Sequence, residues 1–323
     1  MRIDEGQFVA IYGVDQWITL RGLDSNNPPL LIVSGPGAAF SRLTPFFEPW
    51  ENAFTLVQWD QPGAGGTQAK NGDAGTGELS YARLARDGIA VAEFVCRRLR
   101  VEKIGVLGIS GGSIVALMMV KQRPDLFFAY VGTGQIVDWA RQEKLSYAMV
   151  LEQARALGNA EAVAELEKLG PPPYPDAATD AVKSKYANTL TPAEQAVFAS
   201  LRPDVMAAIN SPPAGARYVA PGLPSLDVMT AAMAAYTKLR AELVAFDART
   251  LGLDFAVPMF FFQGDRDAFT VVPLVEGFLA DIRAPQKALE LIEGGGHSAF
   301  FLRDAFFELL VRFVKPLAGP KAR

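Results

Sequence analysis

One serine lies in a glycine-rich turn that could present it as a nucleophile. The segment Gly108–Gly112 has the sequence Gly-Ile-Ser-Gly-Gly, a G-x-S-x-G pattern with Ser110 at its centre. A buried strand is predicted at 104–107 and a helix at 113–121. Glycines at these positions permit a sharp turn that exposes the serine oxygen at the carboxyl end of the strand. Ser110 is therefore the candidate nucleophile, and a phosphate-holding strand-to-helix turn is the alternative.

The only histidine of the chain, His297, is the candidate base. A serine hydroxyl is a poor nucleophile at neutral pH and needs a neighbouring group that takes its proton. His297 follows the glycine run Gly294–Gly296, directly after a strand predicted at 288–292. A loop at the carboxyl end of a strand could reach Ser110, so we expect the two side chains to meet.

A carboxylate must orient the imidazole and stabilise its protonated form. The strand predicted at 257–262 ends near two aspartates, Asp265 and Asp267. Asp267 is favoured, because the turn at Gly264 needs a few residues before a side chain can swing toward the histidine loop. Asp265 and the more distant Asp138 stay open as alternatives.

Two backbone amides are candidates for binding the oxyanion of a tetrahedral intermediate. Gly111 supplies one, because it directly follows the nucleophile. The other should come from the loop 34–37 after an early strand, where Pro36 has no N–H and Gly35 is the better donor. The alternative is that this loop is merely a tight turn.

The elements that must position these residues alternate between strands and helices. Such alternation favours a parallel sheet with both faces covered. A hairpin at the N-terminus is expected to turn at Gly13-Val14-Asp15, and Ser80 is the expected N-cap for the helix at 80–99. The expected strands before the nucleophile and after it are 7–12, 16–21, 30–33, 54–59, 104–107, 126–131, 257–262 and 288–292.

A long Ala-rich stretch with helical periodicity interrupts this pattern. It lies between the strand predicted at 126–131 and the strand predicted at 257–262, and it contains no clear buried strand. We interpret it as a helical cap, residues 137–254, inserted into a core formed by residues 1–136 and 255–323.

Composition excludes several kinds of chemistry. The chain has 323 residues, a net charge of −4, one cysteine and one histidine. These counts exclude an intrachain disulfide, a thiolate zinc site and a multi-histidine metal site. A carboxylate-only Mg²⁺ or Ca²⁺ site is compatible with them, but the sequence contains no D-x-D-x-D-G loop. We expect neither metal nor cofactor. Scattered charges and short apolar runs predict no nucleic-acid partner and no membrane span. We expect a cytoplasmic protein and leave its oligomeric state open.

The motifs together resemble those of the prolyl aminopeptidase (proline iminopeptidase) type of α/β hydrolase. That family carries H-G-G-P-G where this chain has Val33–Gly37, and D-Q-R-G-x-G-x-S where it has Asp60–Thr67. The order Ser110, Asp267, His297 is also that of the α/β-hydrolase triad. The resemblance implies the α/β-hydrolase fold, a mostly parallel twisted sheet flanked by helices, with an inserted helical cap.

The resemblance also implies a substrate class, although this chain departs from the family pattern beside the nucleophile. The family has an aromatic residue after the nucleophile, where this chain has Gly111, and the change affects the proline-shaped pocket. The family binds the α-ammonium of its substrate with cap carboxylates, and Glu143 is our candidate for that role. Trp139 and Tyr147 are candidate residues of an apolar chamber above the serine.

We therefore expect a metal-free serine hydrolase that acts through an acyl-enzyme. Aminopeptidase activity of the prolyl type, on a small-molecule or short-peptide substrate, is the leading hypothesis. Hydrolysis of an ester, a lactone or a C–C bond is the first alternative. A non-catalytic ligand-binding protein with the same fold is the second, since a fold does not fix a function.

Overall fold

A single sheet forms the centre of the molecule in our computed structural model, which describes residues 1–187, 189–210, 219–220, 222 and 228–319. Its strands are β1 (Ile3–Ile11), β2 (Val14–Gly22), β3 (Pro29–Val33), β4 (Thr55–Asp60), β5 (Ile104–Ile109), β6 (Phe127–Thr133), β7 (Met259–Gly264) and β8 (Lys287–Ile292). They lie in the order β1-β2-β4-β3-β5-β6-β7-β8. β1 pairs antiparallel with β2 and β2 with β4, whereas the pairs from β4 to β8 are parallel.

The N-terminal hairpin turns earlier than the sequence predicts. Ile11 pairs with Val14, so the turn consists of Tyr12 and Gly13 alone. Both residues have positive φ, 49° and 83°. Such a two-residue turn matches the twist of antiparallel strands, and glycine favours it. The prediction of a turn at residues 13–15 was wrong in register, although the hairpin itself is present.

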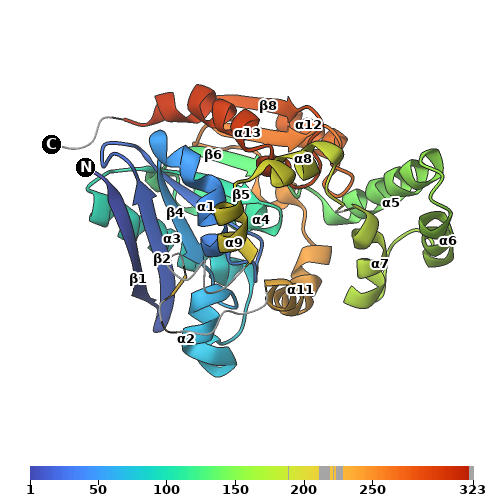
Figure 1. Cartoon of the computed structure of the whole chain (residues 1–323), viewed down its shortest axis with the longest axis horizontal. Coiled ribbons are helices and arrows are strands. Elements are labelled where there is room, and N and C mark those ends of the chain that lie inside the picture. Colours follow the sequence, from blue (N-terminus) through green and yellow to red (C-terminus); the bar gives the residue numbers. More distant parts are fainter. Residues whose placement is uncertain (188, 211–218, 221, 223–227, 320–323) are drawn as a thin grey trace.

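Helices cover both faces of the sheet (Figure 1). None of the helices in the described part of the chain is both long and apolar enough to cross a lipid bilayer. The α-helices of the core are α1 (Thr44–Phe47), α2 (Gly65–Thr76), α3 (Tyr81–Leu99), α4 (Gly111–Gln122), α12 (Val272–Asp281) and α13 (Arg303–Leu309). Single turns of other helix types are η1 (Phe40–Leu43), η2 (Glu48–Asn52), η3 (Pro124–Leu126), η5 (Ala248–Leu251), η6 (Ala299–Phe301), η7 (Leu310–Val314) and η8 (Lys315–Leu317).

Successive residues of the central strands enter two separate hydrophobic cores. In β3, Leu31 belongs to one core, together with residues of α3, α4 and α12, whereas Leu30 and Ile32 belong to the other, together with residues of α1 and α13. Side chains alternate between the two faces of a strand, so a strand buried on both faces is apolar throughout. This burial explains why the strands near Ser110 appear in the sequence as short continuous apolar runs.

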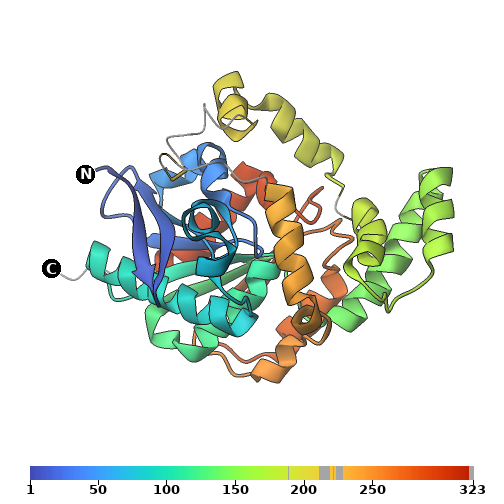
Figure 2. The same ribbon diagram turned by 90° about the horizontal axis from the view of Figure 1, so that it is seen from below.

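A group of helices lies between β6 and β7 along the chain, where the sequence predicts the cap. Figure 2 shows α5, α6 and α7 projecting on one side of the molecule, whereas α8 and α9 run along another side of it. The boundaries proposed for the cap, 137 and 254, stay a prediction. The helices are α5 (Trp139–Ala156), α6 (Ala160–Leu169), α7 (Ala177–Ala187), α8 (Pro192–Ser200), α9 (Pro203–Asn210) and α11 (Val228–Val244).

Candidate active site

The turn between β5 and α4 holds Ser110 in a strained conformation. Its φ and ψ are 54° and −125°, a region that residues other than glycine rarely adopt. A Cβ on Gly112 would lie 2.1 Å from the carbonyl oxygen of Val33, and one on Gly108 would lie 2.7 Å from Ser113 Cα. Both positions therefore require glycine, as the G-x-S-x-G pattern indicates.

His297 reaches both Ser110 and Asp267. Its Nε2 lies 2.9 Å from Ser110 Oγ, and its Nδ1 lies 3.2 Å from Asp267 Oδ2. The three residues follow β5, β7 and β8, whose carboxyl ends share one edge of the parallel sheet. With Nδ1–H donating to the carboxylate, Nε2 is left as an acceptor for the serine proton.

Asp267, rather than the two alternative aspartates, contacts the histidine. Its side chain is buried, and Oδ1 accepts hydrogen bonds from the main-chain N–H groups of Phe269 (2.9 Å) and Thr270 (2.8 Å). Gln263 Nε2 donates to Oδ2 at 2.6 Å. Asp265 is exposed, and Asp138 caps α5 by accepting from the main chain of Arg141.

Two functional neighbours of the triad were not anticipated from the sequence. The Thr270 hydroxyl donates to Asp267 Oδ2 and lies 3.2 Å from His297 Nδ1. Glu194, buried at the start of α8, accepts a hydrogen bond from Gly296 N at 2.8 Å. The Thr191-x-x-Glu194 capping box of α8 was the available signal, and Thr191 also donates to the Gly294 carbonyl. Helix α8 therefore holds the histidine loop in place.

The loop after β3 lies beside the serine turn, as expected for an oxyanion hole. A Cβ on Gly35 would lie 3.8 Å from Gly111 N. Gly111 is the first residue of α4, where a main-chain N–H has no acceptor within the helix. Strands β3 and β5 are also the point where the strand order reverses, the usual ligand-binding position in such sheets. This arrangement leaves Gly35 and Gly111 available as a donor pair.

An aromatic wall lies behind His297. The Phe269 ring packs against the imidazole with 4.7 Å between centroids. Trp139 and Phe269 form a T-shaped pair with 5.9 Å between their centroids. Trp139 thus reaches the surroundings of the triad. Tyr147 lies two turns further along α5, and its hydroxyl donates to the Leu166 carbonyl of α6.

Glu143 forms a buried ion pair beside this wall. Its Oε1 accepts from Lys183 Nζ at 2.5 Å, and the ammonium group lies 5.0 Å from the centroid of the Phe269 ring. Burial raises the pKa of Glu143 and lowers the pKa of Lys183, while each partner opposes the other's shift. Glu143 Oε2 is buried and accepts no hydrogen bond from the described residues. One oxygen of the carboxylate is therefore committed to Lys183, and the other is available.

Asp60, in the motif after β4, fixes the start of α2. Its Oδ2 accepts from Gly66 N at 2.8 Å and from Ser41 Oγ at 3.2 Å. Burial outweighs these hydrogen bonds and raises the pKa of Asp60 from 3.8 to about 6. A raised pKa means that the folded protein binds this proton more tightly than the unfolded chain does.

This raised pKa predicts how stability depends on pH. The stability contributed by protonated Asp60 is present below about pH 4 and is lost as the pH rises through about 6. Relative to Asp60→Asn, the wild type should lose about 2–3 kcal/mol of unfolding free energy between pH 4 and pH 7. Urea unfolding of both proteins at several pH values measures the difference. If the unfolding free energies of the two proteins changed in parallel with pH, Asp60 would not titrate between pH 4 and pH 7.

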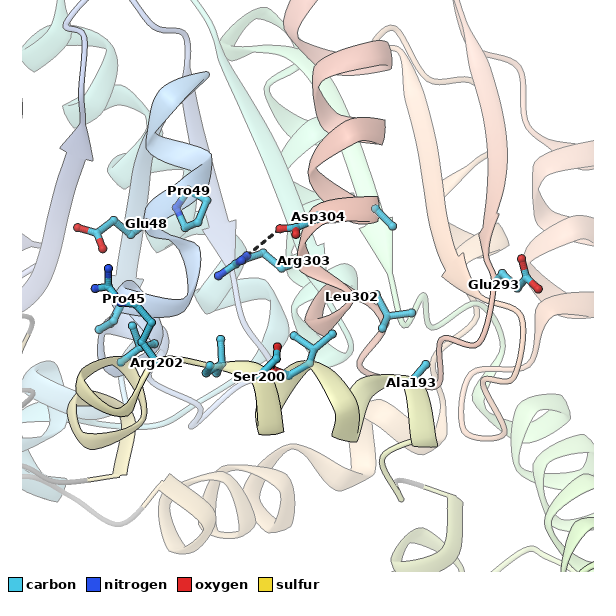
Figure 3. A pocket seen from close by; sticks show the side chains of 14 residues that line it. Pro45, Glu48, Pro49, Ala193, Ser200, Arg202, Glu293, Leu302, Arg303 and Asp304 are labelled. Carbon is cyan, nitrogen blue, oxygen red and sulfur yellow. Dashed lines mark hydrogen bonds and ion pairs between the residues drawn. The ribbon is translucent and has the colours of Figure 1, made fainter.

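A hollow of about 570 Å³ lies where α8 and α9 meet the core. Figure 3 shows its lining side chains, which come from the α1, α8 and α13 regions. None of the triad residues lines it, so it is distinct from the space in front of Ser110. Within the part of the chain that the structure describes, no three His, Cys, Asp or Glu side chains are grouped as metal ligands.

Comparisons with known proteins agree with this architecture. A curated relative, the probable aminopeptidase YbaC of Bacillus subtilis (strain 168), is 24% identical over 302 residues, covering 93% of this chain and 92% of the relative. A proline iminopeptidase-related protein from Thermus thermophilus superimposes with a TM-score of 0.60 at 19% identity, covering 97% of this chain and 99% of that one. A thermophilic esterase from Thermogutta terrifontis gives a TM-score of 0.61 at 14% identity, covering 99% and 100%.

These structural likenesses show the fold, which is that of the α/β hydrolases, and confirm the fold that the motifs predict. The profile of the family described as serine aminopeptidase, S33, matches residues 27–304. That match includes the β3 loop, the serine turn and the loops of Asp267 and His297. The chain belongs to the serine aminopeptidase (S33) family of α/β hydrolases.

Proposed function

We propose that the protein hydrolyses an acyl substrate through a covalent intermediate on Ser110. The observation that carries this proposal is the continuous hydrogen-bonded series from Ser110 through His297 to Asp267. The strained serine turn and the paired amides of Gly35 and Gly111 support the same chemistry.

Each group has a defined task in the reaction. Ser110 Oγ attacks the substrate carbonyl while His297 Nε2 takes the hydroxyl proton. The carbonyl oxygen gains negative charge, which the N–H groups of Gly35 and Gly111 stabilise. Asp267 keeps the imidazole in the required tautomer and stabilises its positive charge. The leaving group departs with the proton held on Nε2, and Ser110 is acylated.

Water then hydrolyses the acyl-enzyme, with His297 again acting first as a base and then as an acid. His297 removes a proton from the water that attacks the acyl carbonyl, and the same two amides bind the second oxyanion. Collapse of this intermediate breaks the bond to Ser110 Oγ, which recovers its proton from His297. The acid product leaves, and the enzyme returns to its starting state.

We propose an aminopeptidase substrate, in which the acyl group is an N-terminal residue such as proline. The family to which the chain belongs and the name of its Bacillus subtilis relative support this class. Glu143 offers a buried oxygen without a partner among the described residues, on a helix that also supplies Trp139 to the wall behind His297. That oxygen would accept a hydrogen bond from the α-ammonium group of the substrate.

An ester without a charged amine is the second candidate, and a specific observation favours it. Lys183 already compensates the charge of Glu143 inside the protein. The nearby carboxylate of Asp180 is likewise paired with Arg240 and accepts from Tyr236. A substrate ammonium entering this cluster would be an additional buried positive charge, whereas a neutral acyl group would not.

Glu143→Gln distinguishes the two substrate classes. If Glu143 binds the α-ammonium, kcat/KM for proline and alanine 4-nitroanilides should fall about 10- to 100-fold, because a charged hydrogen bond is lost. For 4-nitrophenyl acetate, kcat/KM of the variant should stay within about twofold of the wild-type value. Release of the chromophore measures both reactions, and Glu167→Gln, an exposed carboxylate on α6, serves as the matched control.

The pattern across substrates decides the assignment. Turnover of the ester alone by the wild type, with Glu143→Gln unchanged, would replace the aminopeptidase proposal by ester hydrolysis. An equal loss on all substrates would show that the Glu143–Lys183 pair supports the fold rather than the recognition of an amine.

A further inference from the structure

The Tyr81 hydroxyl lies beside the oxyanion hole. A Cβ placed on Gly111 would lie 3.7 Å from Tyr81 Oη and equally 3.7 Å from Gly35 Cα. The same point is only 2.9 Å from Pro36 Cδ, so a larger side chain at position 111 would require the β3 loop to shift. The phenol group and the β3 loop thus occupy the space next to the nucleophile that a side chain at 111 would otherwise fill.

Both the main chain and the side chain of Tyr81 are held by contacts within the fold. It is the first residue of α3, directly after the N-cap Ser80, and its side chain is buried in the larger hydrophobic core. Its main-chain N–H donates to Glu242 Oε2 on α11 at 3.0 Å. The hydroxyl is therefore fixed in position by the helix, the core and α11 together.

The Tyr81 hydroxyl lacks a hydrogen-bond partner in the part of the chain that the structure describes. The other tyrosines there that are buried or partly buried donate to a carbonyl, amide or carboxylate oxygen: Tyr130, Tyr147, Tyr174, Tyr186 and Tyr236. The Tyr81 side chain is buried as a whole, but its hydroxyl oxygen is not one of the fully enclosed polar atoms without a partner. The hydroxyl can therefore donate a hydrogen bond to an acceptor that arrives with the substrate.

The hydroxyl is suited to donate. Burial, with a smaller effect from the charge of Glu242, raises the pKa of Tyr81 well above its ordinary value. The group therefore stays protonated and neutral at the pH where His297 acts as a base. A neutral donor next to two backbone amides can bind an oxygen that becomes negative.

We infer that Tyr81 is a further catalytic residue, whose hydroxyl donates to the substrate carbonyl oxygen as it becomes the oxyanion. This inference rests on the proposed acylation of Ser110. Gly35, Gly111 and Tyr81 together form a three-donor oxyanion site, with Tyr81 supplied by the start of α3 and positioned by the contact of α11.

Tyr81→Phe tests this role because it removes only the hydroxyl. The probe is a fluorophosphonate, whose phosphoryl oxygen occupies the oxyanion site when a serine is phosphonylated, so the natural substrate need not be known. We expect the rate of labelling to fall at least about tenfold, with the final stoichiometry unchanged. Hydrolysis of 4-nitrophenyl acetate should lose kcat by a similar factor while KM stays nearly constant.

The control variant is Tyr186→Phe, which removes a hydroxyl bonded to Glu165 on the cap. It should label at the wild-type rate. The role of Tyr81 would be overturned if Tyr81→Phe were labelled at a rate within twofold of the wild-type rate. It would also be overturned if the substitution changed KM for the ester and left kcat unchanged. A wild type that does not label at Ser110 would overturn the proposed acyl-enzyme and this inference with it. Thermal unfolding of each variant separates loss of a donor from loss of structure.

Discussion

Ser110→Ala is expected to lower kcat/KM by roughly 10⁴- to 10⁶-fold on any substrate that the wild type hydrolyses. Alanine keeps the backbone of the turn but removes the oxygen that bonds to His297 Nε2 at 2.9 Å. The residual rate would come from the oxyanion hole and substrate binding acting on water. Initial rates at high enzyme concentration, with 4-nitrophenyl esters and aminoacyl 4-nitroanilides, measure the loss.

A second substitution at the same position separates chemistry from stability. Glycine adopts the positive φ of Ser110 without strain, whereas alanine does not. Ser110→Gly should therefore be as inactive as Ser110→Ala but more stable by about 1 kcal/mol. Retention of more than about one per cent of the wild-type rate by both variants would mean that another group is the nucleophile.

Asp267→Asn is expected to lower kcat by about 10⁴-fold. The side-chain amide of asparagine can donate to His297 Nδ1, which favours the tautomer whose Nε2 carries a proton and cannot accept one from Ser110. The substitution also conflicts with the surroundings. Asp267 accepts from two main-chain N–H groups, from Gln263 and from the Thr270 hydroxyl, and an amide nitrogen facing those donors would be repelled.

Asp265→Asn is the matched control for this prediction. It changes the same chemical group two residues earlier, on an exposed side chain. Activity should remain near that of the wild type. Asp138→Asn should likewise remain active, because asparagine also caps a helix. A large loss in either control, with Asp267→Asn active, would transfer the orienting role to that aspartate. Measuring kcat for the three variants side by side decides among them.

The strands and the triad could be predicted from the sequence because both depend on local patterns. Short apolar runs gave the positions of β3 to β8, and each triad residue lies within a few positions of a strand end. The carboxyl ends of parallel strands meet at one edge, so sequence order was sufficient to bring Ser110, Asp267 and His297 together. The same reasoning favoured Asp267 over Asp265, and the structure places Asp267 in contact with the imidazole.

Other elements depend on contacts that no local pattern specifies. Helix α2 was missed because its glycines are poor helix formers, and its start depends on the Asp60 carboxylate, which accepts from Gly66 N. The bond from Gly296 N to Glu194 and the approach of Tyr81 to the serine turn join residues far apart in the chain. The pairing of Glu143 with Lys183 is equally distant in sequence, and it changes what the cap carboxylate can bind.

Covalent labelling followed by mass spectrometry tests the central claim, that Ser110 is an activated nucleophile, most directly. The intact wild-type protein is treated with a fluorophosphonate and digested, and the modified residue is located. We predict one adduct per chain on Ser110, and no adduct on Ser110→Ala under the same conditions. Labelling of Ser110→Ala to the same extent as the wild type, or an adduct confined to another residue, would contradict this account.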